Sequence, residues 1–250
     1  PSLEKIVSGY NWDGRIPETA GHEDFFSVIN ANVGGEKSDA RITQNITRTV
    51  FFAKDGTVKV EAKIVRSHSG SVGEERYGAP NINYVRILVP EGSAIVSSSG
   101  FSFPPESAFA VPPKQYEKNS YVVQYENDET FHVGSGTRVT KEFGKTVFGN
   151  WVVTHPGTTT TVMVQYVLPF TFGGDRDGGK KENFLSSFLP RQDRVVRYSV
   201  IASRQSGVRS TLRDEFVLPE GWYMENGVKD VEGELFLTNR FSEYYIHIPQ

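Results

Sequence analysis

Strict alternation of apolar and charged residues between positions 58 and 64 is the feature that most constrains this chain. Val58, Val60, Ala62 and Ile64 share one side of an extended segment, and Lys59, Glu61 and Lys63 share the other. Because successive side chains of a β-strand point to opposite faces, this period of two predicts a strand with one buried face and one solvated face. The apolar residues Ile46, Val50 and Phe52 predict its hairpin partner, and Asp55-Gly56 predicts the turn.

Similar segments recur along most of the chain and predict an all-β protein. Further strands are expected at Tyr84–Val89, Ala94–Ser98, Tyr121–Tyr125, Thr130–Val133, Thr137–Glu142, Thr146–Val153, Thr159–Val167, Val195–Arg204, Thr211–Leu218, Trp222–Glu225, Glu234–Leu237 and Tyr244–Ile248. The 17 Phe, 11 Tyr and 24 Gly suit short strands joined by turns. Two proline pairs predict an irregular loop from Phe101 to Lys114, since proline cannot donate a ladder hydrogen bond.

A glycine-rich run from Phe172 to Lys181 interrupts this pattern and predicts a domain boundary. We therefore expect two sandwich-like (Ig-like) antiparallel β units, the first over residues 44–172 and a second, smaller one over residues 173–250. Residues 1–43 differ from both and are expected to form an N-terminal helical and linker segment that ends an upstream region. Pro1 is an unusual natural start, so we expect a fragment of a longer protein, with any export signal outside it.

A short helix is predicted from Glu23 to Asn32, within the N-terminal segment. Phe25, Val28 and Ile29 follow helical spacing. The Gly34-Gly35 pair then provides a C-terminal stop, because glycine adopts positive φ readily. Such a helix is too short to be stable alone in water, so it is expected to dock on the β-rich part of the chain.

Composition excludes several classes of function. The formal net charge is -3 and no basic stripe is present, which argues against nucleic-acid binding. No apolar run approaches the roughly 18 residues of a membrane span. Cysteine is absent, so disulfides and thiolate metal sites are excluded, and its absence weakly favours an exported protein.

Catalytic and metal-binding motifs are also missing from the sequence. The five histidines lie in no His-x-His or His-x-x-x-His spacing, and no Gly-x-Ser-x-Gly elbow occurs. We therefore predict no catalytic residues, no cofactor and no metal site. Weak calcium binding at Asp175 and Asp177, which lie in the glycine-rich run, is the one alternative left open, although Gly179 and Ser186 break the pattern of a calcium loop.

Two groups of residues are candidates for binding. Asn30, Asn32, Lys37 and Asp39 form a polar cluster that either joins the predicted helix to the first strand or binds a ligand. Trp151, Trp222, Tyr244 and Tyr245 are candidate exposed aromatic residues that could stack on sugars or contact protein, with core packing as the alternative. Because Tyr244 and Tyr245 are adjacent on a predicted strand, they must face opposite sides of the sheet.

Several short motifs, and the order in which they occur, resemble those of a known bacterial family. They are Trp12-Asp13-Gly14-Arg15-Ile16, Glu23-Asp24-Phe25, the segment from Asn30 to Asp39, the segment from Gly144 to Trp151, Pro156-Gly157, the segment from Val164 to Pro169, and Leu218-Pro219-Glu220-Gly221-Trp222. Together they resemble the C-terminal, β-rich region of the family called domain of unknown function 4012. The resemblance implies a cell-envelope protein with a membrane anchor and a helical region upstream, and it implies no catalytic residues.

These observations lead to two functional hypotheses. The first is a non-enzymatic module of the bacterial cell envelope or surface that binds polysaccharide, a neighbouring protein or copies of itself. The second is an enzyme or accessory factor in cell-surface glycan assembly, with its active site mostly in the upstream region. Both place the protein outside the cell or at its surface, attached to the membrane only through an upstream anchor. Converging carboxylates or histidines in a deep pocket would favour the enzyme, and shallow aromatic grooves would favour binding.

Overall fold

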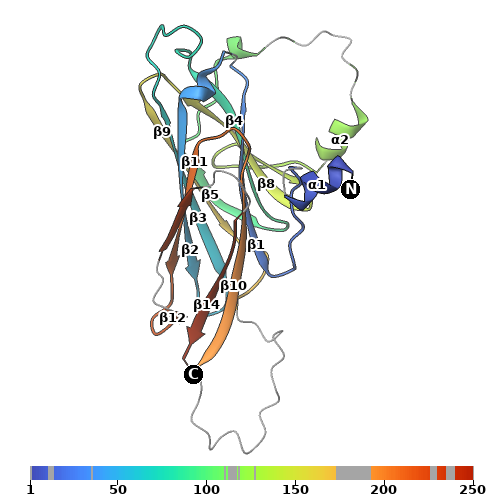
Figure 1. The fold of residues 1–250 in the computed structure, drawn as a ribbon, viewed down its shortest axis with the longest axis vertical. Helices are drawn as coiled ribbons and strands as arrows, with labels where there is room; N and C mark the ends of the chain where they lie inside the picture. Colours follow the sequence, from blue (N-terminus) through green and yellow to red (C-terminus); the bar gives the residue numbers. More distant parts are fainter. Residues whose placement is uncertain are drawn as a thin grey trace, which may run out of the picture.

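The protein forms two β-sheets that pack face to face, with two short helices beside one of them (Figure 1). The computed structural model describes residues 2–10, 14–34, 36–109, 111, 117, 119–126, 128–172, 193–225, 230–234 and 240–249. Apolar side chains from both sheets meet in one large core, which includes Val60 and Val164 from one sheet and Ile87 and Val200 from the other. The all-β prediction is therefore confirmed at the level of fold class.

One sheet has eight strands and the other has six. The eight-stranded sheet has the order β12 (Tyr223–Met224), β14 (Arg240–Ile248), β10 (Arg194–Ser203), β1 (Glu23–Asn32), β4 (Asn81–Pro90), β8 (Lys145–Thr154), β7 (Thr137–Glu142) and β6 (Thr130–His132). The six-stranded sheet has the order β13 (Asp230–Glu234), β11 (Ser210–Val217), β2 (Ile42–Phe52), β3 (Val58–His68), β9 (Thr159–Val167) and β5 (Ala94–Ser99).

In each sheet, a strand from the N-terminal part of the chain pairs in parallel with a strand from the C-terminal part. β1 pairs with β10, and Glu23 lies opposite Ser199; β2 pairs with β11, and Gln44 lies opposite Ser210. The purely antiparallel arrangement expected from the sequence is therefore wrong, and this strand order does not establish an Ig-like topology. The predicted boundaries at residues 43/44 and 172/173 do not separate the sheets. The eight-stranded sheet contains strands from all three predicted segments, and the six-stranded sheet contains strands from the second and the third.

The helix predicted from Glu23 to Asn32 is wrong, because this segment is strand β1. β1 lies between β10 and β4, and the residues from Asp24 to Val28 are buried on both of its faces. Phe26 and Val28 enter the core between the sheets, whereas Phe25 packs on the outer face against Leu88 and Val147. A strand buried on both faces loses its alternation, so its apolar residues imitated helical spacing.

The two described α-helices lie where the sequence did not place them. Helix α1 (Leu3–Gly9) lies in the predicted N-terminal segment but ahead of the helix expected there, and α2 (Ser120–Glu126) replaces the strand predicted at Tyr121–Tyr125. The side-chain oxygen of Asn119 accepts a hydrogen bond from the Tyr121 backbone N–H at 2.9 Å, which starts α2 as an N-cap. Neither described helix is long and apolar enough to cross a membrane.

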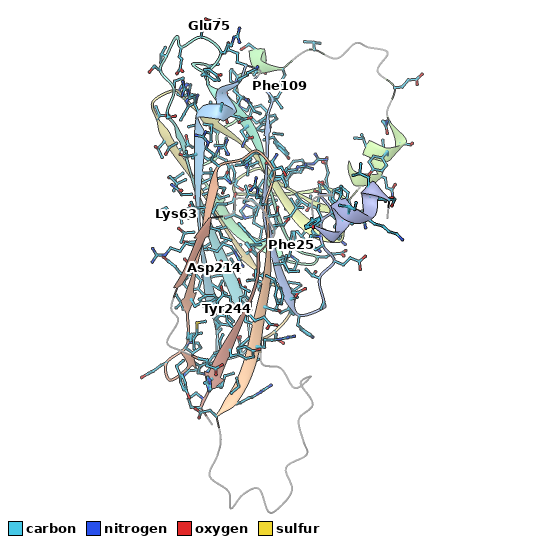
Figure 2. The ribbon with its side chains drawn as sticks, in the orientation of Figure 1. Phe25, Lys63, Glu75, Phe109, Asp214 and Tyr244 are labelled. Atoms are coloured by element: carbon cyan, nitrogen blue, oxygen red, sulfur yellow. The ribbon has the colours of Figure 1, made fainter. Side chains whose placement is uncertain are left out.

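The hairpin of β2 and β3 agrees with the sequence pattern. Val50 lies opposite Val60, and Val58, Val60, Ala62 and Ile64 are all buried. Lys63 is exposed on the outer face of the six-stranded sheet, whereas Tyr244 lies between the sheets (Figure 2). The described part of the predicted proline-rich loop contains only a short 3-10 turn, Glu106–Ala108, as its composition suggested.

Candidate functional site

The polar cluster predicted after β1 lies at one end of the sandwich. The Asn32 side chain donates to the Ser38 hydroxyl at 3.2 Å and accepts the Gly34 backbone N–H at 3.1 Å. The Asp39 carboxylate accepts a hydrogen bond of 2.7 Å from the side-chain amide of Asn81. Lys37 is exposed, and its backbone N–H donates a hydrogen bond to the backbone carbonyl oxygen of Arg76.

Asn30 belongs to a second polar group, which surrounds the buried Arg66. The guanidinium of Arg66 donates to three side-chain oxygens, those of Asn30, Gln44 and Asn81. Burial lowers the pKa of Arg66 to about 10, and nearby Asp39 opposes that shift. Arg66 is only 1% exposed, so this group ties the two sheets together and offers no open surface to a ligand.

The four predicted aromatic candidates occupy different environments and do not form one patch. Trp222 packs against the core beside Phe172, and Tyr244 is buried. Tyr245, the next residue, is 41% exposed, as the alternation of the strand requires. Trp151 lies half-buried on the outer face of the eight-stranded sheet.

Asp175 and Asp177, the possible weak calcium ligands, lie outside the described residues. Within the ranges that the structure covers, no group of three or more His, Asp or Glu side chains is arranged to hold a metal ion.

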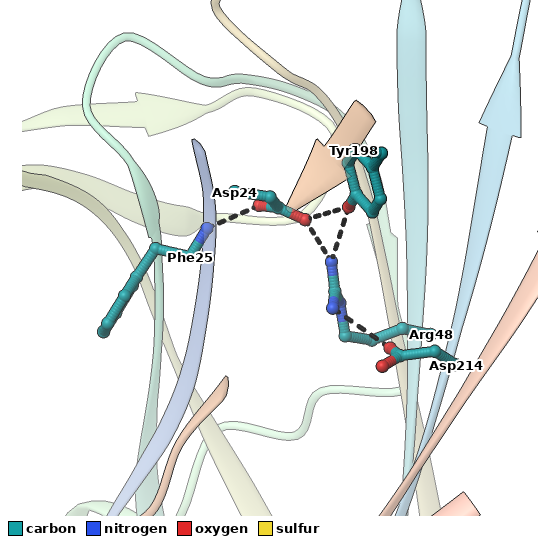
Figure 3. A network of polar contacts seen from close by, with 5 residues as sticks. All are labelled: Asp24, Phe25, Arg48, Tyr198 and Asp214. Carbon is teal, nitrogen blue, oxygen red and sulfur yellow. Dashed lines mark hydrogen bonds and ion pairs between the residues drawn. The ribbon is translucent and has the colours of Figure 1, made fainter. Parts of the chain in front are cut away.

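A buried ionic network connects four strands through the core (Figure 3). Arg48 on β2 donates to Asp24 on β1 and, at 3.0 Å, to Asp214 on β11. The Tyr198 hydroxyl on β10 donates to the same Asp24 oxygen. The opposite carboxylate oxygen of Asp24 accepts the Phe25 backbone N–H at 2.7 Å.

The network is enclosed on all sides. Arg48, Asp24 and Asp214 are each 0% exposed. Burial raises the pKa of Asp24, although the charge of Arg48 partly offsets this effect. For Arg48, burial alone would lower the pKa, but the charges of Asp24 and Asp214 outweigh burial, so the pKa of Arg48 is raised. No solvent reaches these groups, so the network locks the C-terminal strands β10 and β11 to β1 and β2 and does not bind a ligand.

An open cleft of about 220 Å³ lies on the outer face of the eight-stranded sheet. It is lined by Ala31, Tyr84, Arg86, Arg138, Thr140, Glu142, Val147 and Gly149, from β1, β4, β7 and β8. Strand register places Arg138, Gly149 and Arg86 in one row across β7, β8 and β4. The glycine between the two arginines has no side chain and therefore leaves a hollow.

Tyr84 forms part of the floor of the cleft because Gly149 makes room for it. A Cβ atom at Gly149 would lie 2.4 Å from the Tyr84 hydroxyl oxygen, so any other residue there would displace the ring. Burial raises the pKa of Tyr84, and Arg138 partly opposes this shift. The phenol is therefore protonated at neutral pH and can donate a hydrogen bond.

The charged side chains of the cleft form two ion pairs. Arg86 Nη1 lies 3.0 Å from Glu142 Oε2, and Arg138 Nε lies 2.5 Å from Glu129 Oε2. The Thr140 hydroxyl donates to the other Glu142 oxygen at 2.8 Å. These contacts fix the side chains, while Arg86 and Arg138 stay 37% and 31% exposed and can still reach a bound molecule.

Aromatic rings continue from the cleft along β8. The rings of Tyr84 and Trp151 meet edge to face with centroids 4.9 Å apart, and Phe109 packs on Trp151 at 5.2 Å. Phe103 lies 6.2 Å from Trp151 and is 74% exposed. On the opposite side of the cleft, Phe131 pairs with Arg138 across β6 and β7 and is 57% exposed. Aromatic surface therefore flanks the paired charges on two sides.

The sequence patterns found only one member of this site, Trp151. Arg86, Arg138 and Glu142 look like ordinary solvent-facing residues of strands. Gly149 gave a usable signal, because a glycine inside a predicted strand marks a bulge or a close approach. Which arginines flank it depends on the pairing of β4, β7 and β8, and that pairing is not readable from the strands themselves.

Comparisons with known proteins give limited information. No family model matches the chain, and no curated protein sequence matches it. Among solved structures, a protein from Legionella pneumophila that is described as a candidate nutrient binding protein aligns at 7% identity over 89% of this chain and 70% of its own, with a TM-score of 0.37. An M1 zinc metallopeptidase from Deinococcus radiodurans aligns at 9% identity and a TM-score of 0.32, over 82% of this chain and 42% of its own length. These scores carry no functional argument, and the resemblance to domain of unknown function 4012 stays a prediction.

Proposed function

We propose that the chain is a non-enzymatic module of the bacterial cell envelope or surface, and that it binds polysaccharide in the cleft between Arg86 and Arg138. The observation that carries this proposal is the combination in one open hollow of fixed hydrogen-bonding groups and flanking aromatic rings. Ligand sites commonly combine apolar and aromatic walls with a few converging polar groups. The family resemblance supports the location at the cell envelope.

The size of the cleft favours a polymer over a fully enclosed small molecule. Ligand pockets usually enclose roughly 300–1,000 Å³, whereas this cleft holds about 220 Å³ and is open. It can receive part of a longer chain, whose neighbouring units would extend over the aromatic surface at Trp151 and Phe109.

The contacts within the cleft favour binding over catalysis. Each carboxylate, Glu142 and Glu129, already bonds to a guanidinium and is oriented as a hydrogen-bond acceptor. Tyr84, whose pKa is raised, keeps its proton and cannot act as a base at neutral pH. None of the residues described around the cleft is a histidine.

Replacing Arg138 by Met should weaken polysaccharide binding by roughly ten- to a hundredfold. The change removes charge-assisted hydrogen bonds, which contribute about 1.5–3 kcal/mol each. Affinity electrophoresis against extracted bacterial surface polysaccharides would measure the loss, and thermal melting would show whether the fold is intact.

The matched control is Arg197→Met. Arg197 lies on β10 and forms a 2.8 Å ion pair with Glu243, on the same face of the same sheet but outside the cleft. This variant should bind as the wild type does. Equal loss in both variants would show that the cleft is not the site, and release of sugars from the polymer would show that the protein is an enzyme.

A further inference from the structure

We infer that the cleft selects neutral polysaccharides whose sugars carry adjacent free hydroxyl groups, and that it discriminates against acidic ones. This inference rests on the proposed function and adds the chemical class of the ligand. It follows from how the charges of the cleft are paired.

Charge in the cleft is compensated within the protein. Arg86 is paired with Glu142, which also lines the cleft, and Arg138 is paired with Glu129, which lies beside it outside the lining. The four ionised groups of the two pairs sum to zero. A guanidinium binds an anion most strongly through two parallel charge-assisted hydrogen bonds, and each of these two guanidinium groups already contacts a carboxylate of the protein. An acidic sugar would bring its own carboxylate next to Glu142 and Glu129, and like charges placed together disfavour binding.

The pairs nevertheless leave hydrogen-bonding capacity for hydroxyl groups. A guanidinium has five N–H donors, and a carboxylate has four lone-pair positions, so one ion pair uses only part of each. A sugar hydroxyl is both donor and acceptor. Two adjacent hydroxyls can therefore accept from Arg86 and donate to Glu142, whose nitrogen and oxygen lie 3.0 Å apart.

The remaining surface of the cleft matches the apolar side of a sugar ring. Gly149, Val147 and the ring of Tyr84 supply the floor, and Trp151 adds an aromatic ring beside Tyr84. Aromatic rings present an apolar body for such contacts, and the Tyr84 hydroxyl adds one directed donor. Polar groups on the rim and apolar groups on the floor suit an uncharged ring better than a charged group.

The test uses pairs of polymers that keep the same secondary ring hydroxyls and differ in having a primary hydroxyl or a carboxylate. A galactan, a glucan and a mannan are each prepared in neutral form and with their primary hydroxyls oxidised to carboxylates. Binding of the wild type, Arg138→Met and Glu142→Gln is measured at about 0.1 M and about 1 M salt, which changes the Debye length from about 10 Å to about 3 Å.

The wild type should bind at least one neutral polymer, about tenfold more tightly than its oxidised form. Because no net charge is involved, that affinity should change by less than about twofold with salt. Glu142→Gln removes one negative charge beside Arg86, so the preference for the neutral form should fall by roughly three- to tenfold.

Two outcomes would overturn the inference in different ways. Tighter binding of an oxidised polymer, weakened by salt and by Arg138→Met, would refute the neutral ligand and leave the proposed polysaccharide site standing. No binding of any polymer in either form, or binding that Arg138→Met leaves unchanged, would refute both the inference and the proposed function.

Discussion

Replacing Arg48 by Met should destabilise the protein by about 3–5 kcal/mol. The variant keeps two buried carboxylates, Asp24 and Asp214, and removes the cation that lies between them. Removing one member of a buried ion pair leaves an uncompensated charge, which is far more costly than losing an exposed pair. Since a domain is stable by only about 5–15 kcal/mol, this single change should remove a large part of the free energy of unfolding. Urea denaturation would measure it.

The defect of Arg48→Met should also depend on pH. Without the guanidinium, the pKa of Asp24 in the folded state, which burial raises even in the wild type, should lie further above the value of about 3.9 in the unfolded chain. The folded state then binds more protons than the unfolded state, so the free energy of unfolding should fall as the pH rises above about 4. The variant should therefore be closest to the wild type in acid.

Two further variants make this prediction specific. Arg197→Met removes an arginine from an exposed ion pair and should change stability by less than about 1 kcal/mol. Adding Asp24→Asn and Asp214→Asn to Arg48→Met removes the stranded charges and should restore part of the lost stability. If Arg48→Met and Arg197→Met have equal effects on stability, the buried network does not stabilise the fold more than an exposed ion pair does.

Val60→Asp should unfold the protein or cost several kcal/mol of stability. Val60 is 0% exposed on β3, between Val50 of β2 and Tyr166 of β9. An aspartate at this position would bury a charge without a partner, in the centre of the core shared by both sheets. Circular dichroism and thermal melting of purified protein would show the loss directly.

Lys63→Gln on the same strand is the control for Val60→Asp. Lys63 is exposed on the opposite face of β3, so its replacement should shift the melting temperature by little. Similar melting curves for the two variants would mean that the faces of β3 are assigned wrongly.

The local sequence pattern was sufficient to predict a strand where one face of that strand is buried and the other is in water. The alternation from Val58 to Ile64 predicted the strand, its buried face and the hairpin with β2. The same reasoning was wrong for β1, because Phe25 and Phe26 are both buried, on opposite faces of the sheet. Burial depends on what covers each face, and the covering residues come from elsewhere in the chain.

The candidate site shows the same limit. Trp151 could be selected as an aromatic residue in a strand, but the cleft next to it requires β4, β8 and β7 side by side. Arg86 and Glu142 meet across 56 positions of sequence. Neither residue carries a motif, and only the strand register makes them partners.

By itself, the sequence determined the all-β class, the buried face of β3 and the alternating directions of Tyr244 and Tyr245. These properties follow from the period of a strand, which is encoded within about ten neighbouring residues. The register of the β2–β3 hairpin was not among them, because Phe52 pairs with Val58 around a loop that is longer than the two residues Asp55-Gly56. Only the tertiary structure decided the parallel pairing of β1 with β10 and of β2 with β11, the burial of Arg48 between two aspartates, and the cleft. Asp24 and Tyr198 are 174 positions apart, and their contact depends on how both sheets are assembled, which no local pattern records.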